Sequence, residues 1–483
     1  MEFSHDLPIS NGINPQALLN IVNTLDKCNC HSIMFLKNDK IICEGWWKPY
    51  NPDYNHVLFS LSKSFVATAI CFAIQENLIT FEDHITKFFP EYFPCLPCEY
   101  MQRVQIKHLL SMTYGTTKNT TELDFYLLND WLAENLHIYL EKEPGTEFNY
   151  DNRCSFLCSV IIQKVTGLTV FDYLNERLFK PLGIENIWWE SKNGFNMGRG
   201  GLNMKTIDLA KFGIFLLHKG QWNNQQLLRA DLIEEMTRCH IDTSTINFTR
   251  TKAPDYMKGY GYFFWMCQPD MSFRGDGACC QYLVVMPKQN MVIALTAGSM
   301  AKGQVMLNSL WDNLVYNIPN PDMDSSIIQK QLDEKVNSLK IPFYKESTLP
   351  CRNFPSNYSK YNGKIYDLCP NKLNITKISF EFGDNEDIIK LFQTDIKVRI
   401  LHAGHDKWIE NETNSETENF HAHTTIIFNN VACSSKWIVY TRTPYTDTLT
   451  LKFTNKGIVG DYTCFPVMPH RGNDYPIMGI MNE

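Results

Sequence analysis

Apolar positions in the first part of the chain follow strand spacing and then helix spacing. Residues 31–48, HSIMFLKNDKIICEGWWK, form two apolar runs around the polar turn 37–40, which predicts a β-hairpin. From Ser60 to about Glu76 the chain is apolar around most of a helical wheel, so we expect a buried helix there. Mixed helices and turns follow to about residue 190.

Strand spacing returns between residues 259 and 298, in the runs GYGYFFWMC, DGACCQYLVVMP and QNMVIALTAG. A helix that is apolar on one face is predicted over residues 304–316. Because strands at both ends enclose helices, we expect one α+β domain over residues 1–317. Its N- and C-terminal parts should share an antiparallel sheet flanked by helices.

The pattern changes after Asn317. Residues 318–340 contain PNPDMDSS, whose prolines and turn formers predict a linker that leads into a helix. Helical periodicity then disappears, and short alternating runs separated by Asn, Asp and Gly follow. They are KISFEF, IKVRIL, TTIIF, KWIVYT, TLTLKF and IVGDYTCF. We therefore predict a separate antiparallel β domain over residues 341–483, as a small barrel or curved sheet.

Composition narrows the class of protein. The chain has 483 residues, 44% of them hydrophobic, and a net charge of −7 with no Lys/Arg block, so we expect a globular protein without a nucleic-acid partner. With no signal-peptide pattern and no membrane-length apolar run, we expect a cytoplasmic protein that has no membrane partner and keeps its 16 cysteines as thiols. Cys95 and Cys98 form a CxxC pair without further ligands, so we expect a structural or incidental role and no metal.

The stretch FSLSKSF, residues 59–65, places Ser60 and Lys63 three residues apart at the start of the apolar helix. Residues i and i+3 share a helix face, and burial lowers the pKa of a lysine, which makes Lys63 a candidate base for a serine nucleophile. The alternative is an N-cap serine with a solvated lysine in the first turn, since SxxK also occurs by chance.

Two further stretches supply related chemistry. In PGTEFNYDN, residues 144–152, Tyr150 can take or deliver a proton and Asn152 can bridge a lysine and a substrate carbonyl. The alternative there is a core tyrosine and a turn-forming asparagine. In FRGDGACCQYLVVMP, residues 273–287, a glycine-rich approach leads into an apolar strand, as expected where backbone comes close to a ligand.

These three stretches, in this order and spacing, resemble the serine β-lactamase and penicillin-binding-protein superfamily. The likeness is greatest to its β-lactamase-related serine hydrolases, which include class C β-lactamases, carboxylesterases, D-aminopeptidases and 6-aminohexanoate-dimer hydrolases. It runs from about residue 15 to 317 and includes EGWWKPY, IKHLLSMTYG, VTGLTVFDYLNERLFKPLGI and GGLNMKTIDLAKFG. The resemblance implies an all-helical subdomain beside the sheet. The C-terminal β domain resembles the lipocalin-like accessory domains of some D-aminopeptidase relatives.

The resemblance implies a metal-independent serine hydrolase that forms an acyl-enzyme on a small ester, amide or short peptide, with no cofactor. Ser60 becomes the nucleophile, Lys63 the cation that tunes it, and Tyr150 the acid–base residue. Asn152 becomes the residue that holds Lys63 and the substrate. The backbone N–H groups of Ser60 and Ala278 become the oxyanion hole. The C-terminal domain is expected either to cover the active-site mouth or to mediate a homodimer.

The third stretch departs from the family pattern, Lys-Thr-Gly or His-x-Gly. Gly275, Asp276 and Gly277 stand there, preceded by Arg274, and these four are the predicted substrate-binding residues. An aspartate at the centre would repel a substrate carboxylate, which disfavours a β-lactamase and favours a neutral or cationic substrate. Alternatively, Asp276 pairs with Arg274 in a structural role.

His56 lies four residues before Ser60, but with Tyr150 available we assign it to packing, together with His108 and Cys279. Two other functions remain open beside the ester or amide hydrolase. One is β-lactamase or penicillin-binding activity, and the other is a non-catalytic module that keeps the fold to bind a ligand. The joint presence of the four candidate catalytic residues argues against the second.

Overall fold

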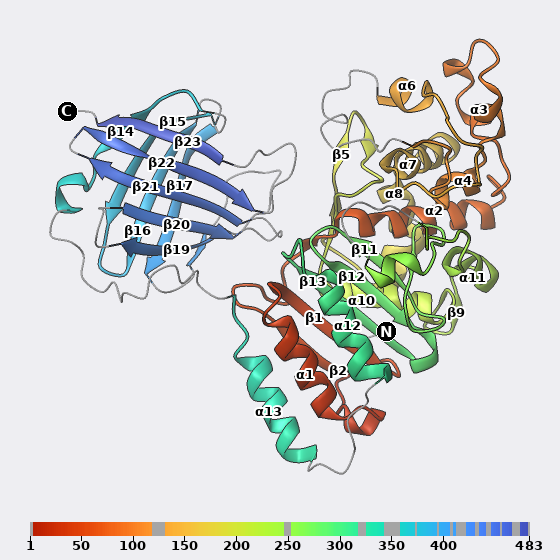
Figure 1. Ribbon diagram of the computed structural model, residues 1–483, viewed down its shortest axis with the longest axis horizontal. Helices are drawn as coiled ribbons and strands as arrows, with labels where there is room; N and C mark the ends of the chain where they lie inside the picture. Colours follow the sequence, from red (N-terminus) through yellow and green to blue (C-terminus); the bar gives the residue numbers. More distant parts are fainter. Residues whose placement is uncertain are drawn as a thin grey trace. The chain divides into compact units, whose positions relative to one another are not determined.

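A computed structural model of the chain separates it into two compact units, Met1–Leu339 and Lys340–Glu483 (Figure 1). Helix α13 (Ser325–Asn337), which the sequence analysis placed in the linker 318–340, lies in the first unit. The structure describes residues 3–117, 131–245, 253–316, 325–341, 358–371, 374–393, 396–405, 409–411, 422–429, 434–440, 446–454, 456–465 and 474–481.

The first unit is built on a six-stranded antiparallel sheet in the order β10-β11-β12-β13-β1-β2. β1 (Cys30–Lys37) pairs with both β2 (Lys40–Trp46) and β13 (Met291–Ala297), which confirms the predicted hairpin and the sheet shared by the two ends of the domain. The hairpin turn consists of Asn38 and Asp39, both with positive φ, as the favoured two-residue turn requires.

The glycine-rich stretch differs from the sequence prediction. The predicted run 259–267 contributes only β10 (Trp265–Met266), whereas β11 (Phe273–Gly277) is a strand of its own before β12 (Gln281–Met286). Glycine has weak strand propensity, but β11 pairs with β10 on one side and β12 on the other. Tertiary pairing therefore makes a strand where the local sequence favours a loop.

Helices cover both faces of this sheet. α1, α12 and α13 pack side by side (Figure 1), and α10 packs against β12 and β13. Val292 and Ala294 of β13 belong to the core formed with α2 and α10, while Ile293 and Leu295 are buried on the opposite face. The predicted all-helical subdomain is confirmed, because α2, α4, α7 and α8 pack together.

The helix bounds are α1 Pro15–Leu25, α2 Ser62–Gln75, α3 Glu99–Arg103, α4 Ile106–Leu110, α6 Trp131–Leu136, α7 Asn152–Thr166, α8 Val170–Leu174, α9 Lys180–Leu182, α10 Thr206–Leu217, α11 Ala230–Thr237 and α12 Gly303–Trp311. Three short strands form a small sheet next to the start of α2: β3 (His56–Val57), β7 (Leu202–Met204) and β4 (Trp188–Trp189). Two two-stranded hairpins complete the unit: β5 Ser191–Lys192 with β6 Phe195–Asn196, and β8 Gln221–Trp222 with β9 Gln225–Gln226.

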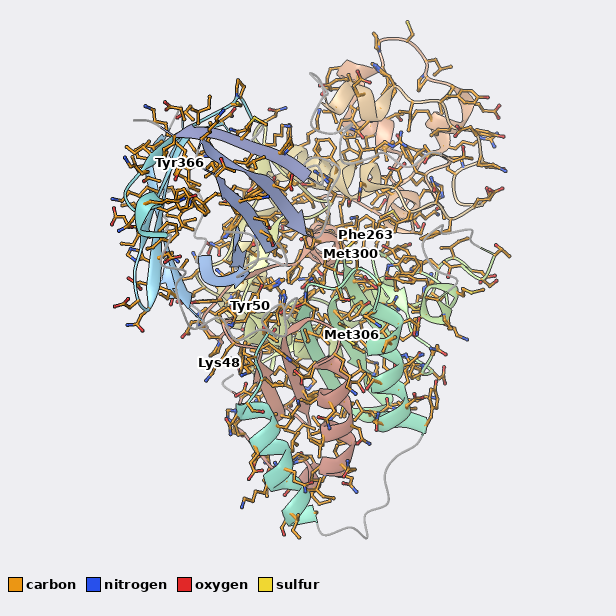
Figure 2. The ribbon with its side chains drawn as sticks, turned by 60° about the vertical axis from the view of Figure 1, so that its left-hand side comes forward. Lys48, Tyr50, Phe263, Met300, Met306 and Tyr366 are labelled. Atoms are coloured by element: carbon orange, nitrogen blue, oxygen red, sulfur yellow. The ribbon has the colours of Figure 1, made fainter. Side chains whose placement is uncertain are left out.

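The second unit is the predicted antiparallel β domain. Ten strands form one sheet in the order β17-β16-β15-β14-β23-β22-β21-β20-β19-β18, and a parallel pairing of β17 with β19 joins its two ends. Its core gathers around the buried Tyr366 (Figure 2), whose ring lies 6.1 Å from that of Phe380 and 6.2 Å from that of Phe453. The strands are β14 Ile365–Leu368, β15 Ile375–Phe382, β16 Glu386–Gln393, β17 Ile396–His405, β18 Ile409–Asn411, β19 Ala422–Asn429, β20 Ser434–Tyr440, β21 Thr446–Thr454, β22 Gly457–Phe465 and β23 Asp474–Met481.

The sequence analysis also made predictions about the cysteines, metal ligands and membrane-spanning helices. Within the described ranges, the cysteines are thiols and no three metal-ligating side chains cluster. No single described helix is long and apolar enough to cross a membrane, although the bent pair Asn152–Thr166 and Val170–Leu182 passes by length and composition when taken together.

Two glycines let β11 lie directly against the turn that carries Ser60. A Cβ atom added at Gly277 would lie 2.1 Å from the carbonyl oxygen of Leu58, and one added at Gly275 would lie 3.0 Å from Cγ of Leu61. Real Cβ atoms do not approach backbone oxygen as closely as 2.1 Å, so position 277 requires glycine in this arrangement.

Gly277→Ala should therefore lower the free energy of unfolding by about 1–3 kcal/mol, the usual cost of overpacking a filled site. Urea denaturation would measure it. Gly200→Ala is the matched control, because its Cβ would meet Phe59 backbone atoms at an ordinary 3.5 Å. We expect the control to stay within about 0.5 kcal/mol of wild type. Equal stabilities of the two variants would contradict the close approach.

Candidate active site

Ser60 lies in a short 3-10 turn, Phe59–Leu61, that runs directly into α2. Lys63, in the first turn of α2, is 1% exposed. Its Nζ donates hydrogen bonds to Ser60 Oγ at 2.9 Å and to the carbonyl oxygen of Arg199 at 2.8 Å. The alternative of a solvated lysine is therefore wrong, and the predicted Ser60–Lys63 contact is present.

The backbone before Ser60 is strained. Phe59 has a φ of 47°, in the left-handed region that side-chain-bearing residues rarely adopt. Ser60 itself remains partly exposed. Strained backbone of this kind persists only where the surroundings impose it, and it concentrates at functional sites.

The carbonyl that receives Lys63 belongs to segment 198–202, which further hydrogen bonds fix in place. Leu202 N–H donates to Ser62 Oγ at 3.1 Å, and Trp189 Nε1 donates to the carbonyl oxygen of Gly200 at 2.8 Å. A buried ammonium group is stable only when acceptors receive its protons, so this segment is part of the site. The sequence analysis did not assign it a role, and its run of glycines was the available signal.

Tyr150 completes a continuous group with these two residues. Lys63 Nζ lies 5.1 Å from the centroid of its ring, and Ser60 hydrogen-bonds its hydroxyl. Burial raises the pKa of Tyr150, while the hydrogen bond from Ser60 lowers it and the charge of Asp276 raises it. With its pKa above the ordinary value near 10, Tyr150 is a neutral phenol at pH 7 in the resting site.

Asn152 begins α7, two residues after Tyr150, and its backbone carbonyl accepts a hydrogen bond from Ser155 Oγ at 3.2 Å. Its predicted role of holding Lys63 and the substrate stays a prediction. Besides Ser60 Oγ, the Arg199 carbonyl accepts a hydrogen bond from Lys63.

Arg274 and Asp276 form an ion pair on β11. Arg274 Nε donates to Asp276 Oδ2 at 2.9 Å, and Tyr256 Oη donates to the same oxygen at 3.0 Å. Burial raises the pKa of Asp276, and Arg274 acts against this rise. The Arg274 side chain is fully buried and also donates to the Met266 carbonyl at 3.1 Å. Of the two alternatives for Asp276, this geometry favours structural pairing with Arg274. The predicted substrate contact of Arg274 stays a prediction.

Gly275 and Gly277 face the start of α2. A Cβ at position 275 would lie 3.0 Å from Leu61 Cγ and 3.1 Å from Ser64 Oγ, which is tighter than most real contacts. A lysine or histidine, as in the family pattern, would fit there only if these neighbours moved. The glycines thus serve close packing against the nucleophile turn.

Ala278 is an exposed residue in the turn between β11 and β12, where the buried Cys279 and Cys280 have φ values of 62° and 69°. Gln281 is fully buried, and its Nε2 contacts the carbonyl oxygens of Ala278 at 3.0 Å, Cys279 at 3.2 Å and Ala297 at 2.7 Å. This one amide therefore fixes the turn that presents the Ala278 N–H. Sequence analysis missed Gln281, although a glutamine opening an apolar strand was a usable signal.

The three residues that the sequence analysis assigned to packing are His56, His108 and Cys279. His56 Nε2 is 3.0 Å from His31 Nδ1, and burial lowers the pKa of His56 to about 4. His108 Nδ1 accepts the N–H of Gln105 at 3.1 Å in a capping box, and Cys279 is buried.

A family model described as Beta-lactamase matches residues 20–307. The chain belongs to the Beta-lactamase family. An uncharacterized protein of Alkalihalophilus pseudofirmus is 26% identical over 250 residues, which are 48% of this chain and 71% of that protein. Protein flp of Staphylococcus aureus is 27% identical over 175 residues, 34% of this chain and 35% of flp, so the match spans about a third of its length.

Solved structures show the Beta-lactamase-family fold. A Bacillus anthracis protein provisionally assigned as a 6-aminohexanoate-dimer hydrolase superposes with a TM-score of 0.52 at 20% identity, over 65% of this chain and 82% of that one. The hydrolase EstCE1, described with promiscuous acyltransferase activity, superposes with a TM-score of 0.50 at 15% identity, over 62% and 99%. At these identities the likeness shows the fold of a hydrolase family and leaves the substrate unassigned.

Proposed function

We propose that this Beta-lactamase-family protein is a serine hydrolase that cleaves a small neutral ester or amide through an acyl-enzyme on Ser60. The observation that carries the proposal is the hydrogen-bonded chain from Lys63 to Ser60, at 2.9 Å, and from Ser60 to Tyr150. A hydroxyl becomes a nucleophile when a base takes its proton and a cation stabilises the alkoxide. Both partners contact Ser60.

In the proposed acylation, Tyr150 first gives its proton to solvent, which happens in a minority of molecules at neutral pH. Ser60 Oγ then attacks the carbonyl carbon while its proton passes to the Tyr150 phenolate. The Lys63 ammonium, held by the Arg199 carbonyl, stays beside the developing charge. The N–H groups of Ser60 and Ala278 stabilise the oxyanion of the tetrahedral intermediate. Tyr150 then returns its proton to the leaving group as the carbon–leaving-group bond breaks, and water repeats the steps to release the acid.

Residues 274–277, which stand at the third motif of the family pattern, support an uncharged substrate. In β-lactamases and transpeptidases a Lys or His there helps to bind the substrate carboxylate. Position 275 is a glycine facing Leu61, and the cation of Arg274 is buried and paired with Asp276. Because this motif presents no exposed cation, an anionic β-lactam or a peptide carboxylate would find no counter-ion on it.

A fluorophosphonate probe, which reacts with activated serines, should label the wild-type protein and fail to label Ser60→Ala. Ser244→Ala is the control, because it removes an exposed serine hydroxyl that donates to Asp242 Oδ2 and belongs to no part of the candidate site, so this variant should keep the label. Intact-protein mass spectrometry reads both outcomes. If the probe still labels the Ser60→Ala variant, Ser60 is not the nucleophile. A wild type that binds a ligand but neither labels nor hydrolyses would favour the non-catalytic module.

Tyr150→Phe keeps the ring but deletes the proton-transfer atom, so kcat should fall about 100-fold or more with little change in melting temperature. Lys63→Ala should be comparably inactive, and the double variant little worse than either, since groups acting as a unit are not additive. Because the pKa of Tyr150 is raised, the phenolate fraction grows with pH, and wild-type kcat/KM should rise from about pH 7 to 9. A near-normal kcat for Tyr150→Phe would return the base role to Lys63 or His56.

Nitrocefin, an anionic β-lactam, should be hydrolysed poorly, whereas p-nitrophenyl acetate or butyrate should be cleaved, because no exposed cation of the third motif meets a substrate carboxylate. Initial rates measured by absorbance on the same preparation compare the substrates. Efficient nitrocefin turnover would show that the carboxylate is bound by other residues and would favour the β-lactamase alternative.

A further inference from the structure

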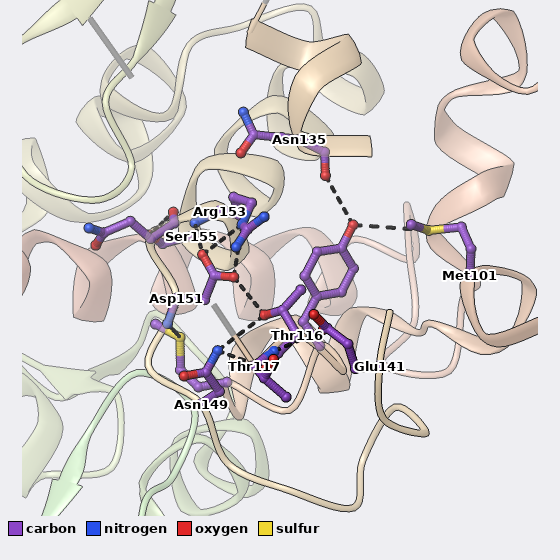
Figure 3. Close-up of polar contacts among 12 residues, drawn as sticks. Met101, Thr116, Thr117, Asn135, Glu141, Asn149, Asp151, Arg153 and Ser155 are labelled. Atoms are coloured by element: carbon purple, nitrogen blue, oxygen red, sulfur yellow. Dashed lines mark hydrogen bonds and ion pairs between the residues drawn. The ribbon is translucent and has the colours of Figure 1, made fainter. Parts of the chain in front are cut away.

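Tyr150 lies outside regular secondary structure, in the extended stretch that leads into α7. Such a stretch is free to adopt several conformations, yet an acid–base hydroxyl must stay within hydrogen-bond reach of its partner. Figure 3 shows a polar network that includes the residues on either side of Tyr150, Asn149 and Asp151. Its contacts explain how the stretch is held.

On the N-terminal side, Asn149 is tied to the turn 112–116. Its backbone N–H donates to the Met112 carbonyl at 2.8 Å, and its Nδ2 donates to the Thr116 carbonyl at 2.8 Å and contacts Thr116 Oγ1 at 3.2 Å. On the C-terminal side, the same Thr116 hydroxyl donates to Asp151 Oδ2 at 2.8 Å. The hydroxyl of Thr116, a residue that is only 5% exposed, thus contacts both chain neighbours of Tyr150.

Asp151 is fully buried and is held by α7 as well as by the turn. As the N-cap of α7, its Oδ1 accepts the N–H of Arg153 at 2.9 Å. Arg153 Nε lies 3.0 Å from Oδ1 and 2.9 Å from Oδ2. A carboxylate at a helix N-terminus is further stabilised by the helix dipole. A buried ion pair adds little net stability, but its fixed partners define one arrangement of the chain.

We infer that Thr116 and Asp151 are positioning residues that hold the Tyr150 hydroxyl against Ser60, an inference that rests on the proposed function. Thr116 contacts the side chains of both residues that flank Tyr150, and Asp151 joins the turn 112–116 to the start of α7. Little freedom then remains for the Tyr150 side chain, whose ring stacks 6.0 Å from that of Trp265. Misplacing a reacting group by about 1 Å costs up to about 100-fold in rate.

Thr116→Val tests this inference, because it keeps the branched shape and removes the shared hydroxyl. We expect kcat and the rate of fluorophosphonate labelling to fall about 10- to 100-fold, with KM changed less than about 3-fold, since the substrate contacts are untouched. Thr296→Val is the matched control: it also removes a buried threonine hydroxyl, which lies 2.6 Å from Ser32 Oγ. It should lower the melting temperature similarly and leave kcat within about 2-fold.

The decisive measurement repeats Thr116→Val in the Tyr150→Phe background. A residue that acts through Tyr150 should cost less than about 2-fold once the Tyr150 hydroxyl is gone, whereas a general loss of structure should cost the same in both backgrounds. If Thr116→Val does not fold, Asn149→Ala removes the Nδ2 bonds at a half-exposed position and should give a smaller loss of kcat in the same direction.

The outcomes separate the two proposals. An unlabelled, inactive wild type would overturn the proposed function itself. An active wild type whose kcat is unchanged by Thr116→Val, or reduced equally with and without the Tyr150 hydroxyl, would leave the function standing and overturn the positioning role.

Discussion

The burial of one ammonium group constrains the rest of this site. Removing a charged lysine from water costs several kcal/mol unless acceptors replace the lost hydration. Lys63 receives them from Ser60 Oγ and from the Arg199 carbonyl, which come from parts of the chain far apart in sequence. The segment that carries Arg199 must therefore be held as firmly as the helix that carries Lys63, and the bonds of Leu202 and Trp189 provide this.

The β1–β2 hairpin and the first buried helix were predictable because each has a clear hydrophobic pattern within one contiguous stretch of residues. The apolar runs of β1 and β2 flank a polar two-residue turn, and the helix from Ser60 is apolar on nearly every side. Ser60, Lys63 and Tyr150 could be predicted together because the stretches that carry them resemble motifs of the family in their order and spacing. The structure brings the three together.

The features that sequence reasoning missed depend on long-range contacts. The acceptor at Arg199 is a backbone carbonyl, which has no side-chain signature and meets Lys63 across 136 positions of sequence. β11 is a strand because of its neighbours in the sheet, although its own glycines disfavour strands. Gln281 contacts the carbonyl oxygens of Ala278 and Cys279 in a turn and that of Ala297 at the end of β13, three residues that only the fold brings together. The glycine run around Arg199 and the glutamine that opens β12 mark these positions in the sequence, but neither signal names the partner that the fold brings to them.

The glycine at position 275 has a consequence for how activity could diverge in this scaffold. A Cβ atom there would meet Leu61 Cγ at 3.0 Å and Ser64 Oγ at 3.1 Å, so these neighbours would have to give by a few tenths of an ångström. Under the proposed function, a side chain placed at position 275 to bind an anionic substrate would therefore also press on the packing around the turn that carries Ser60.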